Sequence, residues 1–293
     1  MNLLEELKLI TQEKNIFVKE PMSKHTTFKT GGSADFFVIA QTREELQKLL
    51  ALKVPKTIIG NGSNLLVKDG GIRGLVIKVG LRHYKVQDDR ITVGAGMVIA
   101  QLSKIAYENS LSGLEFACGI PGTVGGAVVM NAGAYGSEMS SIVLETEVMD
   151  ETGNITMQTE HDFGYRSSIY QKENKIILSA NLKLVHGEQE KIKEQMDANM
   201  KARREKQPID KLSAGSTFKR PKDNFAAKLI QDAGLKGYTI GDAMVSDLHA
   251  GFIINKGKAT SKEILELMKF VQETVQKKYE IMLEPEVKII GED

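Results

Sequence analysis

One stretch of the sequence does most to decide the fold: residues 119–126, which read Gly119-Ile120-Pro121-Gly122-Thr123-Val124-Gly125-Gly126. It places four glycines in eight positions, together with a proline that fixes the entry of the chain. A plain connection rarely needs so many glycines, although that alternative stays open. Glycine clustering of this density is typical of a backbone that a ligand approaches closely, because no Cβ intervenes. We therefore expect this loop to hold a ligand.

A second glycine-rich loop reads Gly60-Asn61-Gly62-Ser63-Asn64 and lies between the apolar runs 57–59 and 65–67. Asn-Gly is the preferred pair of a type I′ turn, so a simple hairpin is one interpretation. The other is a nest of backbone N–H groups that binds a phosphate, with Ser63 and Asn64 as side-chain donors. Two separate phosphate cradles would indicate a dinucleotide ligand.

The composition is that of an ordinary globular protein with a balanced charge. The chain has 293 residues, of which 41% are hydrophobic and 26% charged, enough for a sizeable core and two or three small domains. Lys and Arg number 39 against 38 for Asp and Glu, so no net field favours nucleic acid or an anionic membrane. Cys118 is the only cysteine, and the five histidines lack the spacing of zinc ligands, so we expect no metal site.

The amino-terminal residues 1–15 carry charged side chains among their leucines, which is the pattern of an amphipathic helix and not of a signal peptide. No apolar run approaches the roughly 18 residues that span a bilayer. We therefore expect a cytoplasmic protein.

Periodicity and capping signals predict the elements around the two loops. Thr42 with Glu45, and Thr260 with Glu263, have the spacing of capping boxes. Helices are expected over 42–53, 98–110, 188–207, 224–233 and 260–278, and strands over 36–40, 57–60, 75–79, 142–150, 155–159, 175–185 and 281–290. The strands 142–150 and 155–159 should form a hairpin. The composition changes after Pro208, which predicts a separate α+β domain.

Several common site motifs are absent from the sequence. Gly94-Ala95-Gly96 follows a predicted strand, but Ile99 stands where a dinucleotide fingerprint has its third glycine. There is no Walker-type loop and no Gly-x-Ser-x-Gly motif, so triad hydrolase chemistry is disfavoured.

Three polar residues far apart in the sequence are candidates for chemistry. Arg166 follows Tyr165, but most charged residues lie on the surface. Ser216 follows Gly215 in a predicted tight turn, where a serine is by default a turn or capping residue. Glu286 alternates with apolar residues, and a buried carboxylate is costly unless it is paired.

Taken together, these segments resemble the UDP-N-acetylenolpyruvoylglucosamine reductase family. The segments that carry the resemblance are residues 59–66, 119–126, 165–167, 214–218 and 283–287, in the family's order and within residues 26–290. The stretch from Ser167 to Lys175 lacks the family's tyrosine-bearing insertion, so the chain resembles the short form.

The resemblance implies an α+β fold with an FAD-binding region of the vanillyl-alcohol-oxidase (PCMH) type and a smaller α+β substrate domain. The expected division is 1–80 and 81–207 for the two FAD-binding subdomains, 208–280 for the substrate domain, and 281–293 for a strand that returns to the active-site cleft. FAD would be bound non-covalently by Gly60, Asn61, Gly62, Ser63, Asn64, Leu65, Gly119, Ile120, Pro121, Gly122, Gly125 and Gly126.

The same resemblance implies a reaction: reduction of UDP-N-acetylglucosamine enolpyruvate to UDP-N-acetylmuramate with NADPH, in peptidoglycan precursor synthesis. Hydride would pass from reduced FAD to C3 and a proton from Ser216 to C2, with Arg166 and Glu286 as the other catalytic residues. The implied substrate-binding residues are Tyr135, Tyr165, Lys206 and Arg220. The protein would act as a monomer or weak oligomer on small molecules, without nucleic acid or membrane.

Two rival functions stay open at this point. One is a flavin oxidase of the same fold that uses O2 and another alcohol or sugar. The other is a nucleotide-sugar binding protein that senses its ligand without transforming it, and such a protein would be colourless when purified.

Overall fold

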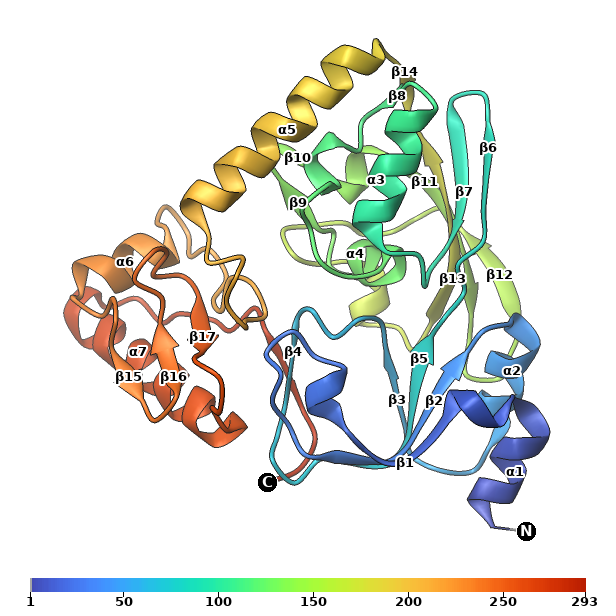
Figure 1. Ribbon diagram of the computed structural model, residues 1–293, viewed down its shortest axis with the longest axis horizontal. Coiled ribbons are helices and arrows are strands. Elements are labelled where there is room, and N and C mark those ends of the chain that lie inside the picture. Colours follow the sequence, from blue (N-terminus) through green and yellow to red (C-terminus); the bar gives the residue numbers. More distant parts are fainter. Residues whose placement is uncertain (1) are drawn as a thin grey trace. The chain divides into compact units, whose positions relative to one another are not determined.

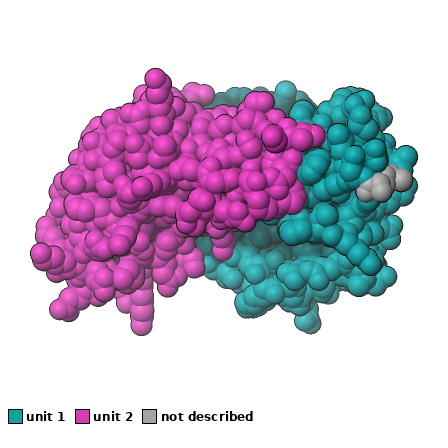
Figure 2. All heavy atoms as spheres, turned by 90° about the horizontal axis from the view of Figure 1, so that it is seen from below, with its two compact units in different colours: residues 1–17, 36–61, 75–202 teal, residues 18–35, 62–74, 203–293 magenta. Residues whose placement is uncertain are grey.

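The computed structural model describes residues 2–293, so Met1 of the predicted amino-terminal helix lies outside the described residues. These residues form two compact units, coloured separately in Figure 2. Unit 1 comprises residues 2–17, 36–61 and 75–202, and unit 2 comprises residues 18–35, 62–74 and 203–293. Segments 18–35 and 62–74 thus belong with the carboxy-terminal part of the chain, although the sequence places them in the expected first subdomain.

The main sheet of unit 1 has five strands in the order β12-β11-β13-β7-β6, and all neighbours are antiparallel (Figure 1). The strands are β6 (Tyr84–Gln87), β7 (Arg90–Gly94), β11 (Val143–Met149), β12 (Ile155–Gln158) and β13 (Ile176–Lys183). The predicted hairpin is confirmed, because Met149 pairs with Ile155 where β11 turns into β12.

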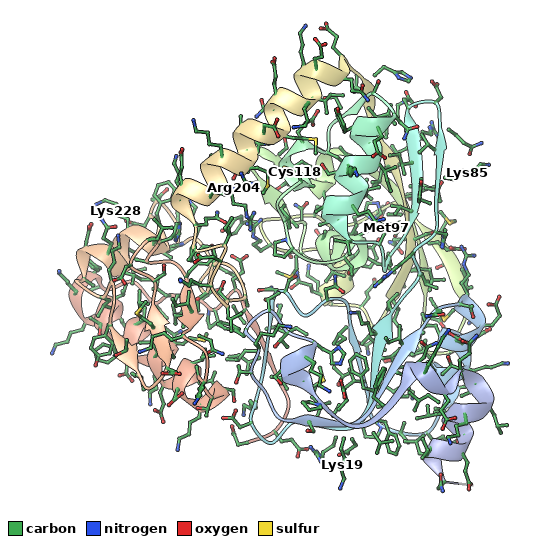
Figure 3. The ribbon with its side chains drawn as sticks, in the orientation of Figure 1. Lys19, Lys85, Met97, Cys118, Arg204 and Lys228 are labelled. Atoms are coloured by element: carbon green, nitrogen blue, oxygen red, sulfur yellow. The ribbon has the colours of Figure 1, made fainter. Side chains whose placement is uncertain are left out.

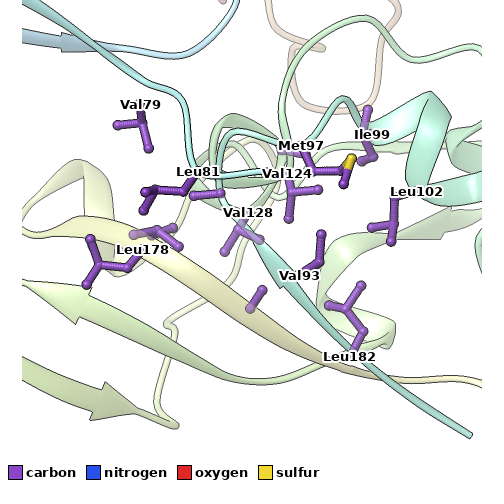
Figure 4. Close-up of a cluster of buried hydrophobic side chains, with 14 of the residues drawn as sticks. Val79, Leu81, Val93, Met97, Ile99, Leu102, Val124, Val128, Leu178 and Leu182 are labelled. Atoms are coloured by element: carbon purple, nitrogen blue, oxygen red, sulfur yellow. The ribbon is translucent and has the colours of Figure 1, made fainter. Parts of the chain in front are cut away.

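Two helices pack their apolar faces on this sheet, α3 (Ile99–Glu108) and α4 (Val124–Val129). Figure 4 shows where they meet it: Val124 and Val128 of α4 and Leu102 of α3 lie among Val93 and Leu182 of the sheet. All five side chains are fully buried. Burial of such a side chain stabilises the fold by about 1.5–3 kcal/mol. This packing fixes the helix that follows the glycine-rich loop 119–126.

The amino-terminal part of the chain builds a second sheet, with four strands in the order β1-β2-β5-β3. They are β1 (Ile16–Pro21), β2 (Ser33–Ala40), β3 (Lys56–Ile59) and β5 (Ile72–Val79). Strands β3 and β5 are parallel. Strands β1, β2 and β5 each begin in one unit and end in the other. Helices α1 (Leu3–Ile10) and α2 (Arg43–Ala51) pack together in unit 1, and the capping box of Thr42 and Glu45 is confirmed.

The remaining elements of unit 1 are short pairs of strands and one long helix. Strand β8 (Leu111–Ser112) pairs with β14 (Val185–His186), and β9 (Gly133–Ala134) pairs with β10 (Ser137–Glu138). Helix α5 (Gln189–Lys206) ends before Pro208, as predicted, because proline cannot continue a helix.

In unit 2, one helix packs against a three-stranded sheet and a second helix packs against the first. The helices are α6 (Ala226–Asp232) and α7 (Ser261–Tyr279), and the antiparallel strands are β15 (Thr239–Ile240), β16 (Ala243–Val245) and β17 (Ile253–Asn255). Helix α7 begins with the predicted capping box of Thr260 and Glu263. Its buried residues Ile264, Leu267, Val271 and Val275 recur at three and four residues and belong to the core of this unit.

The predicted strand over 281–290 is too long. Only β18 (Lys288–Ile290) is a strand, and it pairs in parallel with β4 (Leu65–Val67). The residues before β18 pair with another segment and not with β4. The N–H of Glu286 donates to the carbonyl of Thr217 at 2.8 Å, and Pro285 forms an isolated antiparallel β-bridge with Phe218. Among the described residues, no helix is long and apolar enough to cross a membrane.

Candidate active site

Within unit 1, Gly60, the first residue of the loop 60–64, lies against the loop 119–126. A Cβ added to Gly60 would lie 2.5 Å from Oγ1 of Thr123, closer than real Cβ atoms approach. Thr123 caps α4, since its side chain accepts from the N–H of Gly126 at 3.4 Å. Gly122 has a φ of 124°, which favours glycine. No local pattern in the sequence indicates that these loops meet. Their contact forms one cradle that a side chain at Gly60 would fill.

Part of the loop 119–126 serves backbone packing and not a ligand. The N–H of Val124 donates to the carbonyl of Met97 at 2.8 Å, and that of Gly125 to Ala95 at 2.9 Å. A Cβ on Gly125 would lie 2.9 Å from Cβ of Ala95, whereas one on Gly126 would find only Oγ1 of Thr123, at 3.5 Å. Gly125 is therefore required for packing, and Gly126 is the exposed glycine with room around it.

The same close packing explains the near-miss fingerprint at residues 94–99. A Cβ on Gly96 would lie 2.6 Å from the backbone nitrogen of Leu81. This glycine lets two chain segments meet and does not form a dinucleotide loop.

The hairpin interpretation of residues 60–64 is wrong. Strands β3 and β4, which flank the loop, belong to different sheets. The boundary between the units falls inside the loop, after Asn61. Gly62 has a φ of 63°, and a Cβ there would lie 2.1 Å from the carbonyl oxygen of His25.

Residues 25–27 support this loop from within unit 2, a role that the sequence reasoning missed. The N–H of Thr27 donates to the carbonyl of Gly62 at 3.3 Å, and its hydroxyl to the carbonyl of Ser63 at 3.4 Å. The available signal was the run His25-Thr26-Thr27 shortly before the Gly31-Gly32 pair, because hydroxyls and glycines together are typical of a structured loop.

Ser216 and Glu286 are brought together on neighbouring segments of unit 2. Gly215 has a φ of 78° at a bend of the backbone, and Ser216 follows it half-buried. The next residue, Thr217, is fully buried and anchors the turn: its N–H donates to Gly251 at 2.8 Å, and its hydroxyl accepts from the N–H of Ile253 at 3.0 Å. Its carbonyl accepts from the N–H of Glu286 at 2.8 Å.

Glu286 is also hydrogen-bonded to Asn64, the last residue of the loop 60–64, which belongs to the same unit. The side-chain amide of Asn64 donates to the backbone carbonyl of Glu286 at 3.1 Å, and the N–H of Lys288 donates to the carbonyl of Asn64 at 3.0 Å. Glu286 is half-buried, whereas the neighbouring Glu284 is exposed and pairs with Lys219 at 3.1 Å.

Arg166 lies in unit 1 at the tip of a tight hairpin, half-buried, with a φ of 52°. A left-handed conformation costs a non-glycine residue about 1–3 kcal/mol and is typical of functional sites. The guanidinium lies 5.3 Å from the ring centroid of Tyr165 and 3.4 Å from the carbonyl of Gly133. The Ser140 hydroxyl, with the Asn131 amide and a weaker effect of the Arg166 charge, holds the pKa of Glu138 below its usual range.

The predicted substrate-binding residues lie in both units. In unit 1, Tyr135 is 46% exposed with its hydroxyl donating to the carbonyl of Asn199 at 2.9 Å, and Tyr165 is 53% exposed. In unit 2, Lys206 is exposed at the end of α5, and the Arg220 guanidinium lies 4.0 Å from the ring centroid of Phe225.

Cys118 is held inside unit 1 beside α5 (Figure 3), where its thiol donates to the carbonyl of Met196 at 3.6 Å. No group of three or more His, Cys, Asp or Glu that could hold a metal ion occurs within residues 2–293.

Comparison with known proteins shows the class of protein to which the chain belongs. Residues 34–157 match the model of an FAD binding domain, and residues 207–290 match that of the UDP-N-acetylenolpyruvoylglucosamine reductase C-terminal domain. Both glycine-rich loops fall within the first match. The protein is therefore an FAD-containing oxidoreductase, and the predicted combination of an FAD-binding region with an α+β carboxy-terminal domain is confirmed.

Full-length relatives give the family. The chain is 48% identical to the UDP-N-acetylenolpyruvoylglucosamine reductase of Caldanaerobacter subterraneus, over 99% of this chain and 98% of that protein. It is 49% identical to the reductase of that name from Clostridium botulinum, over 100% of this chain and 98% of that protein. The solved Thermus caldophilus UDP-N-acetylenolpyruvylglucosamine reductase is 37% identical with a TM-score of 0.82, covering 94% of this chain and 97% of that one. The chain belongs to the UDP-N-acetylenolpyruvoylglucosamine reductase family.

Proposed function

We propose that this protein reduces UDP-N-acetylglucosamine enolpyruvate to UDP-N-acetylmuramate with NADPH, as a step of peptidoglycan precursor synthesis. One observation carries the proposal: Ser216 and Glu286 lie on hydrogen-bonded neighbouring segments, in a chain almost half identical along its whole length to reductases of this name. A proton donor and a carboxylate are what the second half of such a reduction requires.

The glycine-rich loops are the proposed FAD site. The cradle where Gly60 meets Thr123, and the exposed Gly126, fit a diphosphate that must approach the backbone closely. We assign residues 60–65, 119–122 and Gly126 to FAD, whereas Gly125, which was also expected at the cofactor, packs against Ala95. Bound FAD would supply the hydride chemistry, taking a hydride from NADPH and giving it to C3 of the enolpyruvyl group.

Arg166 is assigned to the substrate carboxylate. Hydride addition at C3 leaves negative charge spread from C2 onto that carboxylate. A planar guanidinium pairs with a carboxylate in bidentate fashion and stabilises the charge as it develops. The left-handed backbone of Arg166 holds the side chain at the tip of its hairpin.

Ser216 is assigned as the donor of the proton to C2, which completes the saturation of the double bond. The left-handed Gly215 and the buried Thr217 fix its backbone on both sides. Glu286 is assigned to orient the substrate or to tune the donor. Tyr135, Tyr165, Lys206 and Arg220 remain proposed contacts of the rest of the substrate.

An anaerobic titration tests the proposal. The purified protein should be yellow, NADPH should bleach it, and the enolpyruvyl substrate should restore the absorbance, whereas UDP-N-acetylglucosamine should not. A colourless protein would support a nucleotide-sugar sensor. Reoxidation by O2 alone, with no response to the enolpyruvyl substrate, would support an oxidase.

A further inference from the structure

A buried polar network closes the base of the Arg166 hairpin. The hydroxyl oxygen of Tyr170 lies 2.7 Å from Nδ1 of His161 and 2.6 Å from Oγ1 of Thr146 on β11. The exposed fractions are 6% for Tyr170, 7% for His161 and 0% for Thr146. Three polar side chains buried together are costly unless their hydrogen bonds are complete.

The network has a consistent direction of donation. Nε2 of His161 faces the carbonyl of Leu144 at 3.4 Å, so a proton on Nε2 leaves Nδ1 as an acceptor. Tyr170 then donates to His161, and Thr146 donates to Tyr170. Burial lowers the pKa of His161 and raises the pKa of Tyr170, so both side chains are neutral near pH 7.

The network is joined directly to the hairpin. The N–H of Ile169, next to Tyr170, donates to the carbonyl of His161 at 2.8 Å. Inside that closure, Gly164 and Ser167 exchange backbone hydrogen bonds of 3.0 and 3.2 Å around Arg166. The base of the hairpin is thus fixed to β11, and the tip carries the one left-handed arginine among the described residues.

Two further side chains hold the returning half of the hairpin. The hydroxyl of Ser168 donates to the carbonyl of Val129 at 2.7 Å, and the amide of Gln171 donates to the carbonyl of Arg166 at 2.9 Å. Val129 is the last residue of α4, whose first turn contains Gly125 and Gly126. The hairpin is therefore hydrogen-bonded to the last residue of α4, the helix whose first turn is part of the loop 119–126.

We propose that His161, Tyr170 and Thr146 are positioning residues for Arg166: they touch neither substrate nor cofactor, but hold the hairpin in the geometry that aims the guanidinium. The inference rests on the proposed function for the role of Arg166. Because a misplacement of about 1 Å can cost about 100-fold in rate, a loosened hairpin base should reduce the reaction without removing any reacting group.

The main test is Tyr170→Phe, which removes one oxygen and keeps the ring, with the 51% exposed Tyr84→Phe on β6 as the matched control. We expect Tyr170→Phe to slow reoxidation of the reduced flavin by the enolpyruvyl substrate about 10-fold. Reduction by NADPH, FAD content and the behaviour of Tyr84→Phe should match the parent protein. An unchanged reoxidation rate in folded Tyr170→Phe overturns the proposal.

A double-mutant cycle distinguishes positioning from general loosening. In an Arg166→Ala background, adding Tyr170→Phe should cause no further loss of reoxidation rate, because the group being positioned is gone. An additive loss would show that Tyr170 does not act through Arg166. If Tyr170→Phe does not fold, Thr146→Val removes only the hydrogen bond to the Tyr170 oxygen and should give a smaller loss with the same non-additivity.

Amide hydrogen exchange gives a readout that does not depend on activity. Tyr170→Phe should speed exchange at the Ser167 and Ile169 amides relative to the five-stranded sheet, and Tyr84→Phe should not. Unchanged exchange there overturns the positioning role. If the parent protein itself is not reoxidised by the enolpyruvyl substrate, the proposed function has failed, and exchange alone still decides whether the network orders the hairpin.

Discussion

The side-chain amide of Asn64 donates a hydrogen bond of 3.1 Å to the backbone carbonyl of Glu286. Next to this bond, β4 and β18 pair in parallel from Leu65 and Lys288 onward. Residues 62–67 and the segment that carries the proposed carboxylate are therefore parts of one local structure within unit 2. A change in either one is expected to reach the other.

Substitution of Asn64 tests this coupling. Asn64→Ala removes one partly buried hydrogen bond, which should lower the free energy of unfolding by about 1 kcal/mol and slow flavin reoxidation. Asn64→Asp should be worse, since its carboxylate cannot donate and would face the Glu286 carbonyl. Denaturant unfolding and stopped-flow absorbance measure the two effects. Equal behaviour of the two variants would argue against the hydrogen bond as the cause.

The proton-donor role of Ser216 predicts a selective defect. Ser216→Ala should retain FAD and its reduction by NADPH but lose about 100-fold or more in reoxidation by the enolpyruvyl substrate, as for a missing general acid. Ser213→Ala, in the same connecting segment, is the control and should be close to the parent protein. A near-normal steady-state rate of the Ser216→Ala protein would show that Ser216 is not the proton donor.

The two glutamates of the carboxy-terminal segment form a natural comparison. Glu286→Gln should weaken flavin reoxidation with unchanged FAD content, because it removes the carboxylate and keeps the size of the side chain. Glu284→Gln removes only an exposed ion pair with Lys219, and such pairs contribute about 0–1 kcal/mol. Its reoxidation rate should be normal. Stopped-flow measurement of both half-reactions separates the two, and equal defects would contradict the assignment.

His161 predicts how stability depends on pH. Burial holds the pKa of His161 below its usual value of 6.5 in the folded protein. Between pH 6.5 and the folded pKa, the unfolded chain therefore binds a proton at His161 and the folded chain does not. The contribution of His161 to stability is complete above pH 6.5 and is lost as the pH falls towards the folded pKa. His249 is half-buried, and this burial lowers its pKa, so it acts in the same direction. Unfolding curves at pH 7.5 and 5.5 should show a smaller pH dependence for His161→Gln than for the parent protein.

Local signals in the sequence were sufficient for many elements. The capping boxes at Thr42 and Thr260 placed two helix starts correctly, because their bonds are made within four residues. The strand predicted over 281–290 failed because Glu286 is paired with Thr217, a partner about 70 residues away that no local pattern indicates. Long-range pairing, and not propensity, decided that segment.

The candidate site likewise has features that local sequence patterns predict and features that depend on long-range contacts. Glycine density predicted the two loops, but glycines serve both ligands and backbone packing, and the sequence alone does not separate Gly125 from Gly126. The support of the loop 60–64 by Thr27, and the network of His161 and Tyr170, depend on contacts between residues distant in sequence whose types have many other uses. These roles become visible only from contacts.

The contrast between Gly125 and Gly126 also separates ligand binding from packing by experiment. Gly125→Ala places a Cβ 2.9 Å from Cβ of Ala95 and should destabilise the protein whether or not FAD is bound. Gly126→Ala meets nothing closer than 3.5 Å and lies within α4, where alanine stabilises a helix over glycine by up to about 1 kcal/mol. Stripped of FAD, the Gly126→Ala protein should therefore unfold at or above the temperature of the parent apoprotein.

If the exposed face of this glycine receives the FAD diphosphate, the same variant should bind FAD at least 10-fold more weakly, as about 1.4 kcal/mol of steric interference requires. Calorimetric unfolding of the apoprotein and titration with FAD measure the two quantities, and unweakened FAD binding by Gly126→Ala would remove this residue from the proposed cofactor site.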